Sequence, residues 1–199
     1  MRGMLAMSEN DTVAALKNFM TSRMQQADFV DPLIQIAHIY MAQNDTLAKV
    51  FFKEAITVSP DNYYLTYDYA MYLQENGYPE EALAYYDSLL EIMPDNTDFN
   101  FNKGYVYLVY LGENEKAEEI FNKQLERLQT DYVDFYLIHS VSETNYPHYL
   151  NDEKYGDFSY FVKQKELGRI KHIGFSIHAS FDILKGFIEA YGEHIDFVQ

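Results

Sequence analysis

The sequence contains no cysteine and few cationic residues. Without cysteine, the chain has no disulfide, no thiolate chemistry and no cysteine-ligated zinc or iron–sulfur cluster, a composition compatible with the cytoplasm. Its 15 Lys and Arg residues stand against 31 Asp and Glu residues, and the formal net charge is −16. Because such a chain repels a phosphate backbone and has no Lys/Arg cluster to offset this, we expect no nucleic-acid partner.

Long apolar runs are also missing. Nowhere do about 18 apolar residues stand together, as a membrane-spanning helix requires. The N-terminal apolar run before Ser8 is too short for a signal peptide. We therefore expect an uncleaved cytoplasmic chain with no membrane partner. With 48% hydrophobic and 17% aromatic residues, the composition predicts a packed core.

A pattern with a period of about 34 residues runs through the first part of the chain. A small residue is followed four positions later by an aromatic one, with successive spacings of 33, 34 and 35 residues, at Ala15 and Phe19, Ala48 and Phe52, Ala82 and Tyr86, and Ala117 and Phe121. Pro60 and Pro94 are 34 residues apart, and each is followed by Asp-Asn, a turn signal that predicts the end of a helix. A period of this length indicates stacked helical hairpins.

The best-formed unit runs from Asn62 to Pro94, with residues at the spacing of two antiparallel helices: Tyr69, Ala70, Leu73, Gly77, Ala82, Tyr86 and Leu89. It resembles a tetratricopeptide repeat (TPR), and the resemblance covers about residues 1–123. We expect half of one repeat and then three hairpins, with helices near residues 30–43 and 46–58, 62–75 and 79–92, and 98–110 and 114–128. The third hairpin has one extra residue, which we place in its inner turn.

The resemblance implies a superhelix whose concave groove binds a peptide or protein. The groove positions that it implies on the first helices are Ile34, His38, Tyr64, Tyr67, Met71, Phe101 and Tyr105. The alternative is that these side chains form the core between repeats, and the sequence leaves the choice open. The Lys, Arg and Asn set that clamps a C-terminal carboxylate in some family members is not found in the pattern, so a chaperone tail is not the expected ligand.

The pattern changes after Gln124 to alternating strands and helices. We expect strands at Tyr132 to Ser140, Ile170 to Ile177 and Ile195 to Gln199, and helices at Lys154 to Leu167 and Phe181 to Tyr191. Strand, helix and strand at this spacing predict parallel pairing with right-handed crossovers.

Two segments of this region, Gln124 to His139 and Lys163 to Ser180, resemble the aldo-keto reductases in the right order and at the right distance. The resemblance covers about residues 116–199 and implies a three-stranded parallel β/α fragment of a TIM-type barrel. Family members transfer hydride from NADPH or NADH to a carbonyl. By this resemblance His139 orients the carbonyl, while Ser176 and Gln199 contact the nicotinamide.

Most of that family's active site is absent from the sequence. Its tyrosine, aspartate and lysine belong to earlier barrel strands, which the helical array replaces here, and its phosphate-binding loops follow later strands, beyond Gln199. The family's asparagine beside the serine falls on Ile177. We therefore favour the interpretation that His139, Ser176 and Gln199 are relics, and we expect no cofactor and no metal.

The sequence thus predicts an α plus α/β chain, with a TPR-like α-solenoid at residues 1–127 and a partial aldo-keto reductase-like segment at residues 128–199. The stretch Glu115 to Leu128 fits both the repeat pattern and the aldo-keto reductase pattern. One helix can therefore belong to both regions, as expected for a natural or constructed chimera. Because the chain starts inside a repeat and stops inside a strand, we expect that both of the proteins from which such a chimera is built are truncated. The favoured function is a peptide- or protein-binding scaffold joined to a catalytically incomplete fragment. The alternatives are an NAD(P)-dependent oxidoreductase acting on carbonyls, if another chain completes the barrel, and a molecule with no evolved function.

The partial barrel raises a further expectation about its sheet. Parallel strands are normally covered on both faces, yet this fragment supplies crossover helices for one face only. Either the last helices of the array fold over the other face, or a second copy pairs with it. We expect self-association through this exposed sheet.

Overall fold

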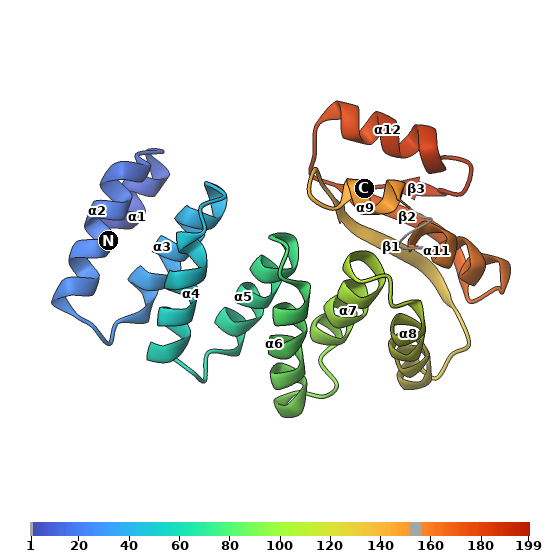
Figure 1. Cartoon of the computed structure of the whole chain (residues 1–199), viewed down its shortest axis with the longest axis horizontal. Helices are drawn as coiled ribbons and strands as arrows, with labels where there is room; N and C mark the ends of the chain where they lie inside the picture. Colours follow the sequence, from blue (N-terminus) through green and yellow to red (C-terminus); the bar gives the residue numbers. More distant parts are fainter. Residues whose placement is uncertain (1, 152–156) are drawn as a thin grey trace.

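The computed structural model describes residues 2–151 and 157–199 as an array of helical hairpins with a small parallel sheet at one end (Figure 1). The helices of the array are α1 (Arg2–Ser8), α2 (Thr12–Gln25), α3 (Val30–Ala42), α4 (Leu47–Val58), α5 (Tyr63–Glu75), α6 (Pro79–Ile92), α7 (Thr97–Tyr105), which continues as the π-helix η1 (Val106–Tyr110), and α8 (Asn114–Leu128). Each packs against its neighbour in the chain. The three predicted hairpins are present, and a short α1 packs against α2 where half of a repeat was expected.

Local sequence sets where the array helices begin and turn. The side chains of Asn62 and Asn96 accept hydrogen bonds from the backbone N–H three residues later and so cap α5 and α7. The turns within the hairpins contain one residue with positive φ, namely Asn44 at 53°, Gly77 at 84° and Gly112 at 65°. Asn and Gly adopt this left-handed conformation at the lowest cost, which explains why these residues end the first helix of each hairpin.

The extra residue of the third hairpin lies inside a helix. The helix α5 begins at Tyr63 and α7 begins at Thr97, but the left-handed residues that follow them, Gly77 and Gly112, are 35 residues apart. The additional residue is accommodated by the wider π-helical turn η1, which is the usual result of a one-residue insertion in an α-helix. The expectation of a longer inner turn was therefore wrong.

The repeated small and aromatic residues form the core of the array. Ala15, Ala48 and Ala82 are fully buried. Phe52 and Tyr86, one turn further along their helices, are also fully buried. The small residue lets two helices approach closely, and the ring fills the space beside the crossing. This is the physical basis of the 34-residue period.

The remainder of the chain forms a three-stranded parallel sheet in the order β1-β2-β3. Its elements are β1 (Val133–Val141), α9 (Tyr146–Leu150), α11 (Asp157–Glu166), β2 (Ile170–Ile177), α12 (Phe181–Tyr191) and β3 (Phe197–Val198). The predicted parallel pairing is confirmed. The third strand is shorter than expected, α9 was not predicted, and residues 154–156 of the expected helix lie outside the described residues.

The two faces of the sheet differ in how they are covered. On one face, Tyr136 packs on Phe161 of α11 with ring centroids 5.1 Å apart, and Phe175 packs on Phe187 of α12 at 4.6 Å. On the other face, Phe135 is 69% exposed and stacks on His172 of the neighbouring strand. The crossover helices therefore cover one face, as expected, and part of the other is open.

The sheet is attached to the last hairpin of the array. Arg169 forms an ion pair with Glu118, donates to Asn122 and lies over the ring of Phe121 in α8, at 4.9 Å from its centroid. The Gln164 side chain donates to Glu118 at 2.7 Å. The short α9 packs against η1, where the Tyr105 and Tyr149 hydroxyl groups are 3.1 Å apart. No helix in the described part of the chain is long and apolar enough to cross a membrane.

Candidate functional site

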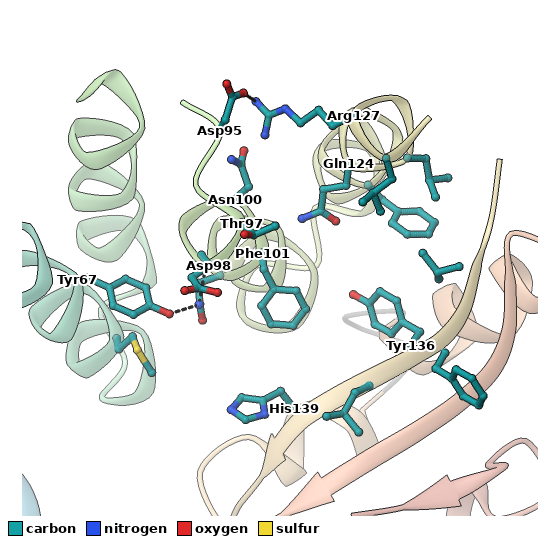
Figure 2. A pocket seen from close by; sticks show the side chains of 18 residues that line it. Tyr67, Asp95, Thr97, Asp98, Asn100, Phe101, Gln124, Arg127, Tyr136 and His139 are labelled. Carbon is teal, nitrogen blue, oxygen red and sulfur yellow. Dashed lines mark hydrogen bonds and ion pairs between the residues drawn. The ribbon is translucent and has the colours of Figure 1, made fainter. Parts of the chain in front are cut away.

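A cavity of about 860 Å³ lies between α5, α7 and α8 of the array and the strand β1 (Figure 2). It is lined by Tyr67, Met71, Asp95, Thr97, Asp98, Asn100, Phe101, Asn102, Phe121, Gln124, Leu125, Arg127, Leu128, Val133, Phe135, Tyr136, Leu137 and His139. The cavity is thus built from both regions of the chain. We call it the junction cleft.

A chain of hydrogen bonds holds the array wall of the junction cleft. The Tyr86 hydroxyl donates to Gln74 Oε1 at 2.7 Å, and Gln74 Nε2 approaches Asn102 Oδ1 at 3.4 Å. Asn102 Nδ2 then donates to the Tyr67 hydroxyl at 2.7 Å. Since Tyr67 accepts this bond, its own hydroxyl hydrogen is available for another acceptor.

The electrostatic surroundings keep the Tyr67 hydroxyl protonated. Burial, followed by the nearby carboxylates of Asp98 and Asp68, raises the pKa of Tyr67 to about 12. The hydroxyl is therefore a hydrogen-bond donor, and not an anion, at any pH near neutrality. Its ring lies 5.2 Å from that of Phe99, which fixes its position at the cleft wall.

The charged groups of the junction cleft leave one carboxylate without a cation. Arg127 pairs with Asp95 at 3.0 Å and also donates to the backbone oxygen of Pro94. Asp98 lines the same cavity, and within residues 2–151 and 157–199 no cationic nitrogen lies within ion-pair distance of it. The cleft therefore favours a ligand that carries positive charge.

The sheet wall of the cleft contains the histidine singled out in the sequence. His139 lines the cavity at the C-terminal end of β1, and its Nδ1 lies 3.3 Å from the hydroxyl of Ser176 in β2. Parallel register places these two side chains on the same face of the sheet. Gln199 lies outside the cavity lining, and its backbone N–H donates to Phe175 at 2.9 Å.

Four of the sequence-derived site residues are brought together here: Tyr67, Met71, Phe101 and His139. Tyr105 lines a small adjoining pocket of about 60 Å³, where it accepts a hydrogen bond from Asn145. The remaining groove positions lie outside the cleft lining, Ile34 and His38 in α3 and Tyr64 at the start of α5.

Those three residues have different surroundings. Ile34 is half-buried against the core, as the alternative interpretation of the groove positions allowed. His38 lies 3.6 Å from Asp68 on the next repeat and contacts the ring of Phe52. Tyr64 is 82% exposed.

Sequence reasoning missed Asp98, Asn102 and Arg127. Asp98 and Asn102 are four residues apart and share a helix face with Phe101 and Tyr105, so helical spacing alone could have identified them. The approach of β1 to α5 has no such signal, because it depends on how α9 and α8 hold the sheet against the array.

The residues at the cleft do not fit a nicotinamide dinucleotide. Such a cofactor carries phosphates, which need cations or exposed backbone N–H groups. The cation that lines the cleft, Arg127, is already paired with Asp95, while Asp98 would repel a phosphate. Among the residues that the structure describes, no group of three or more His, Cys, Asp or Glu side chains could hold a metal ion.

Comparison with known proteins gives matches to two different groups. The aldo/keto reductase family model matches residues 104–196, slightly under half of the chain. Among curated proteins, none is significantly similar in sequence to this chain. The family match begins near the end of α7 and includes η1 and α8 of the last hairpin of the array.

Solved structures with tetratricopeptide repeats resemble the chain. A tetratricopeptide repeat protein from Parabacteroides merdae superposes with a TM-score of 0.60 at 17% identity, covering 96% of this chain and 70% of that one. MamA (AMB-1) gives 0.54 at 18% identity, covering 64% and 69%. PilW, a type IV pilus biogenesis factor, gives 0.53 at 20% identity, covering 82% and 73%. At such identities the likeness shows the fold alone, and the array of this chain has the TPR-type fold.

Proposed function

We propose that the chain is a TPR-type scaffold that binds a peptide or protein segment in the junction cleft, and that residues 128–199 are a catalytically incomplete fragment of a TIM-type aldo-keto reductase barrel. The array is assigned to residues 1–127. The observation that carries the proposal is the convergence of Tyr67, Met71 and Phe101 from the array with β1 around one cavity.

The chemistry of the lining suits a peptide. Tyr67 and Phe101 offer large, rigid contact surfaces that lose little conformational entropy on binding. Tyr67, Asn102 and Asp98 supply hydrogen-bonding groups beside those surfaces. A volume of about 860 Å³ is in the range of ligand sites and holds several side chains of a peptide.

Catalytic incompleteness is supported by the surroundings of His139. Carbonyl reduction needs a proton donor near the carbonyl oxygen. The hydroxyl that lies within hydrogen-bond distance of His139 Nδ1 is that of Ser176, a weak acid, and the tyrosine of the array wall, Tyr67, has a raised pKa. Neither group has the environment of an activated acid. In this proposal His139, Ser176 and Gln199 are relics of a barrel active site.

The binding proposal is tested with a library of capped octapeptides and the purified full chain. Tyr67→Ala should lower the affinity for the selected peptides roughly tenfold or more, because a ring and a hydrogen-bond donor are lost. Tyr64→Ala is the matched control, since this tyrosine is on the same helix but outside the cleft. Equal losses for both variants, or no binder at all, would contradict the proposal.

The competing function is an oxidoreductase completed by another chain, and the 3.3 Å approach of His139 to Ser176 favours it, because both residues belong to the expected site. On our proposal, the purified chain shows no NADPH-dependent reduction of simple aldehydes. Turnover that His139→Ala abolishes would establish the competing function instead.

A further inference from the structure

We propose that the bound segment is an extended, cationic peptide that pairs as an additional strand with the open edge of β1 inside the junction cleft. The inference rests on the proposed function, since it names the conformation and charge of the peptide that the cleft would bind. It joins three observations: the unpaired edge of β1, the position of that edge in the cleft, and the unpaired carboxylate opposite.

The edge of β1 follows from the strand order and the hydrogen-bond pattern. Among the residues that the structure describes, β1 pairs with β2 alone. The N–H of Val133 donates to the backbone oxygen of Arg169, the residue before β2, at 2.9 Å. Backbone groups alternate in direction along a strand, so the N–H and C=O of Asp134, Tyr136 and Ile138 point away from β2. Across the described ranges, no hydrogen bond to another segment satisfies these groups.

The unpaired edge lies next to the cavity. β1 contributes Tyr136, Leu137 and His139 to the lining, and Figure 2 shows the strand crossing the cleft opposite Tyr67 and Phe101. A strand paired with β1 would lie about 4.8 Å from it, and successive side chains would point to opposite sides. Residues 134–138 span about 13 Å, enough to pair with a short peptide segment.

One strand fits this edge better than a second copy of the sheet. The hairpin α7–α8 lies alongside β1, where Phe121 of α8 contacts the ring of Tyr136 at 6.0 Å. A second sheet with its own helices would have to occupy the space of this hairpin, whereas a single extended chain would not. Backbone pairing provides affinity in such β-strand addition, and the side-chain pockets provide selectivity.

The charge of the peptide follows from the array wall. Asp98 is exposed at the cleft without a cation, and Arg127 is neutralised by Asp95. A Lys or Arg side chain of the ligand can pair with Asp98 while lying over the ring of Phe101 or Tyr67. The net charge of −16 attracts the same class of peptide from a distance, whereas an acidic segment would be repelled.

Proline substitution tests the backbone pairing on the full chain. Asp134→Pro removes one N–H that points away from β2, a position where edge strands accept proline. Asp134→Ala is the matched control, because it loses the same ion pair to Lys171 but keeps the N–H. The probe is a library of capped octapeptides with Val, Thr or Tyr at alternate positions and Lys, Glu or Ser at the others.

Lys should be enriched among the peptides that bind. Asp134→Pro should bind these peptides with roughly tenfold lower affinity than Asp134→Ala, as expected for lost hydrogen bonds. Hydrogen exchange at Tyr136 and Ile138 should slow when the peptide binds. N-methylation of the peptide should reduce affinity at alternate positions only, a result that does not depend on the folding of any variant.

The outcomes separate the two proposals. Suppose that Tyr67→Ala lowers the affinity for the selected peptides, that Asp134→Pro and Asp134→Ala bind them with equal affinity, and that hydrogen exchange at Tyr136 is unchanged by the peptide. This result would overturn strand addition and leave the cleft as a peptide site. Enrichment of Glu or Ser would overturn the charge assignment. No binder in the library would overturn both. Protection of the β1 amides by self-association without peptide would assign the edge to a second copy of the chain and also overturn the inference.

Discussion

The helical array and the parallel sheet bury their apolar residues in different ways. In the array, each hairpin covers the next, so the crossing residues Ala48 and Ala82 are fully buried by neighbours close in sequence. In the sheet, α11 and α12 cover one face, while Phe135 on the other is 69% exposed. A repeat array can be shortened or extended without losing its core, whereas a three-stranded parallel sheet with helices on one face depends on another element to cover its second face.

Among the tests of this comparison, the removal of a buried ring from each region should change the free energy of unfolding most. Phe52 in α4 and Phe187 in α12 are both fully buried among other rings. Substitution to alanine at either position should cost about 3–5 kcal/mol in the free energy of unfolding. If the two regions are separate folding units, hydrogen exchange should increase only in the region that carries the substitution. An equal increase in both regions would show one cooperative unit and contradict the boundary near residue 127.

Overpacking a helix crossing gives a smaller effect and tests the array alone. Ala82 is fully buried where α6 packs on α5, so Ala82→Leu should cost on the order of 1–3 kcal/mol. The control is Ala84→Leu on the same helix, where the side chain is exposed. Chemical denaturation measures both. An unfolding midpoint for Ala82→Leu equal to that of the control would show that the crossing is placed wrongly.

The connection between the regions should contribute less than either core. Arg169 and Glu118 form an ion pair in which both side chains are more than half-buried. A double-mutant cycle with Arg169→Ala and Glu118→Ala should give a coupling free energy of about 0.5–3 kcal/mol. A coupling close to zero would show that the hydrogen bonds of Gln164 and the packing of α9, and not this pair, hold the sheet against the array.

A substitution on the exposed face of the sheet should change the free energy of unfolding least. It should have a larger effect on the fraction of the chain that forms dimers. We expect the chain to self-associate through the face that carries Phe135, Phe197 and His172, because these rings contact each other while Phe135 and His172 are exposed and Phe197 is half-buried. Phe135→Ser should leave stability nearly unchanged and reduce the fraction of dimer in analytical ultracentrifugation. A parent chain that is monomeric at every concentration would show that no second copy covers this face.

The sequence was most informative where the structure depends on local patterns. The period set by Ala48, Ala82 and their aromatic partners predicts the hairpins, and the strand patterns predict Ile170–Ile177 and the helix Phe181–Tyr191 with the observed bounds. The π-helical turn Val106–Tyr110 was missed, because a one-residue insertion has the same length whether it lengthens a turn or a helix.

The candidate site was predicted only in part. Tyr67, Met71 and Phe101 follow from the repeat pattern and His139 from the barrel motif, but nothing in either pattern places β1 beside α5. That contact depends on tertiary packing: Arg169 pairs with Glu118 of α8, and the Tyr149 hydroxyl contacts that of Tyr105 at the end of α7. Whether Asp98 has an ion-pair partner likewise depends on which cations the fold brings near it, and this cannot be predicted from a sequence pattern.

Chemical-shift mapping by NMR tests the central claim most directly, with a peptide selected from the octapeptide library added to the full chain. If the junction cleft is the binding site, the backbone amides that shift most belong to both regions at once, around Met71 and Phe101 in the array and around Leu137 and His139 in β1. Shifts confined to α4 and α6, or to residues around Gln199, would place the ligand elsewhere and contradict the account.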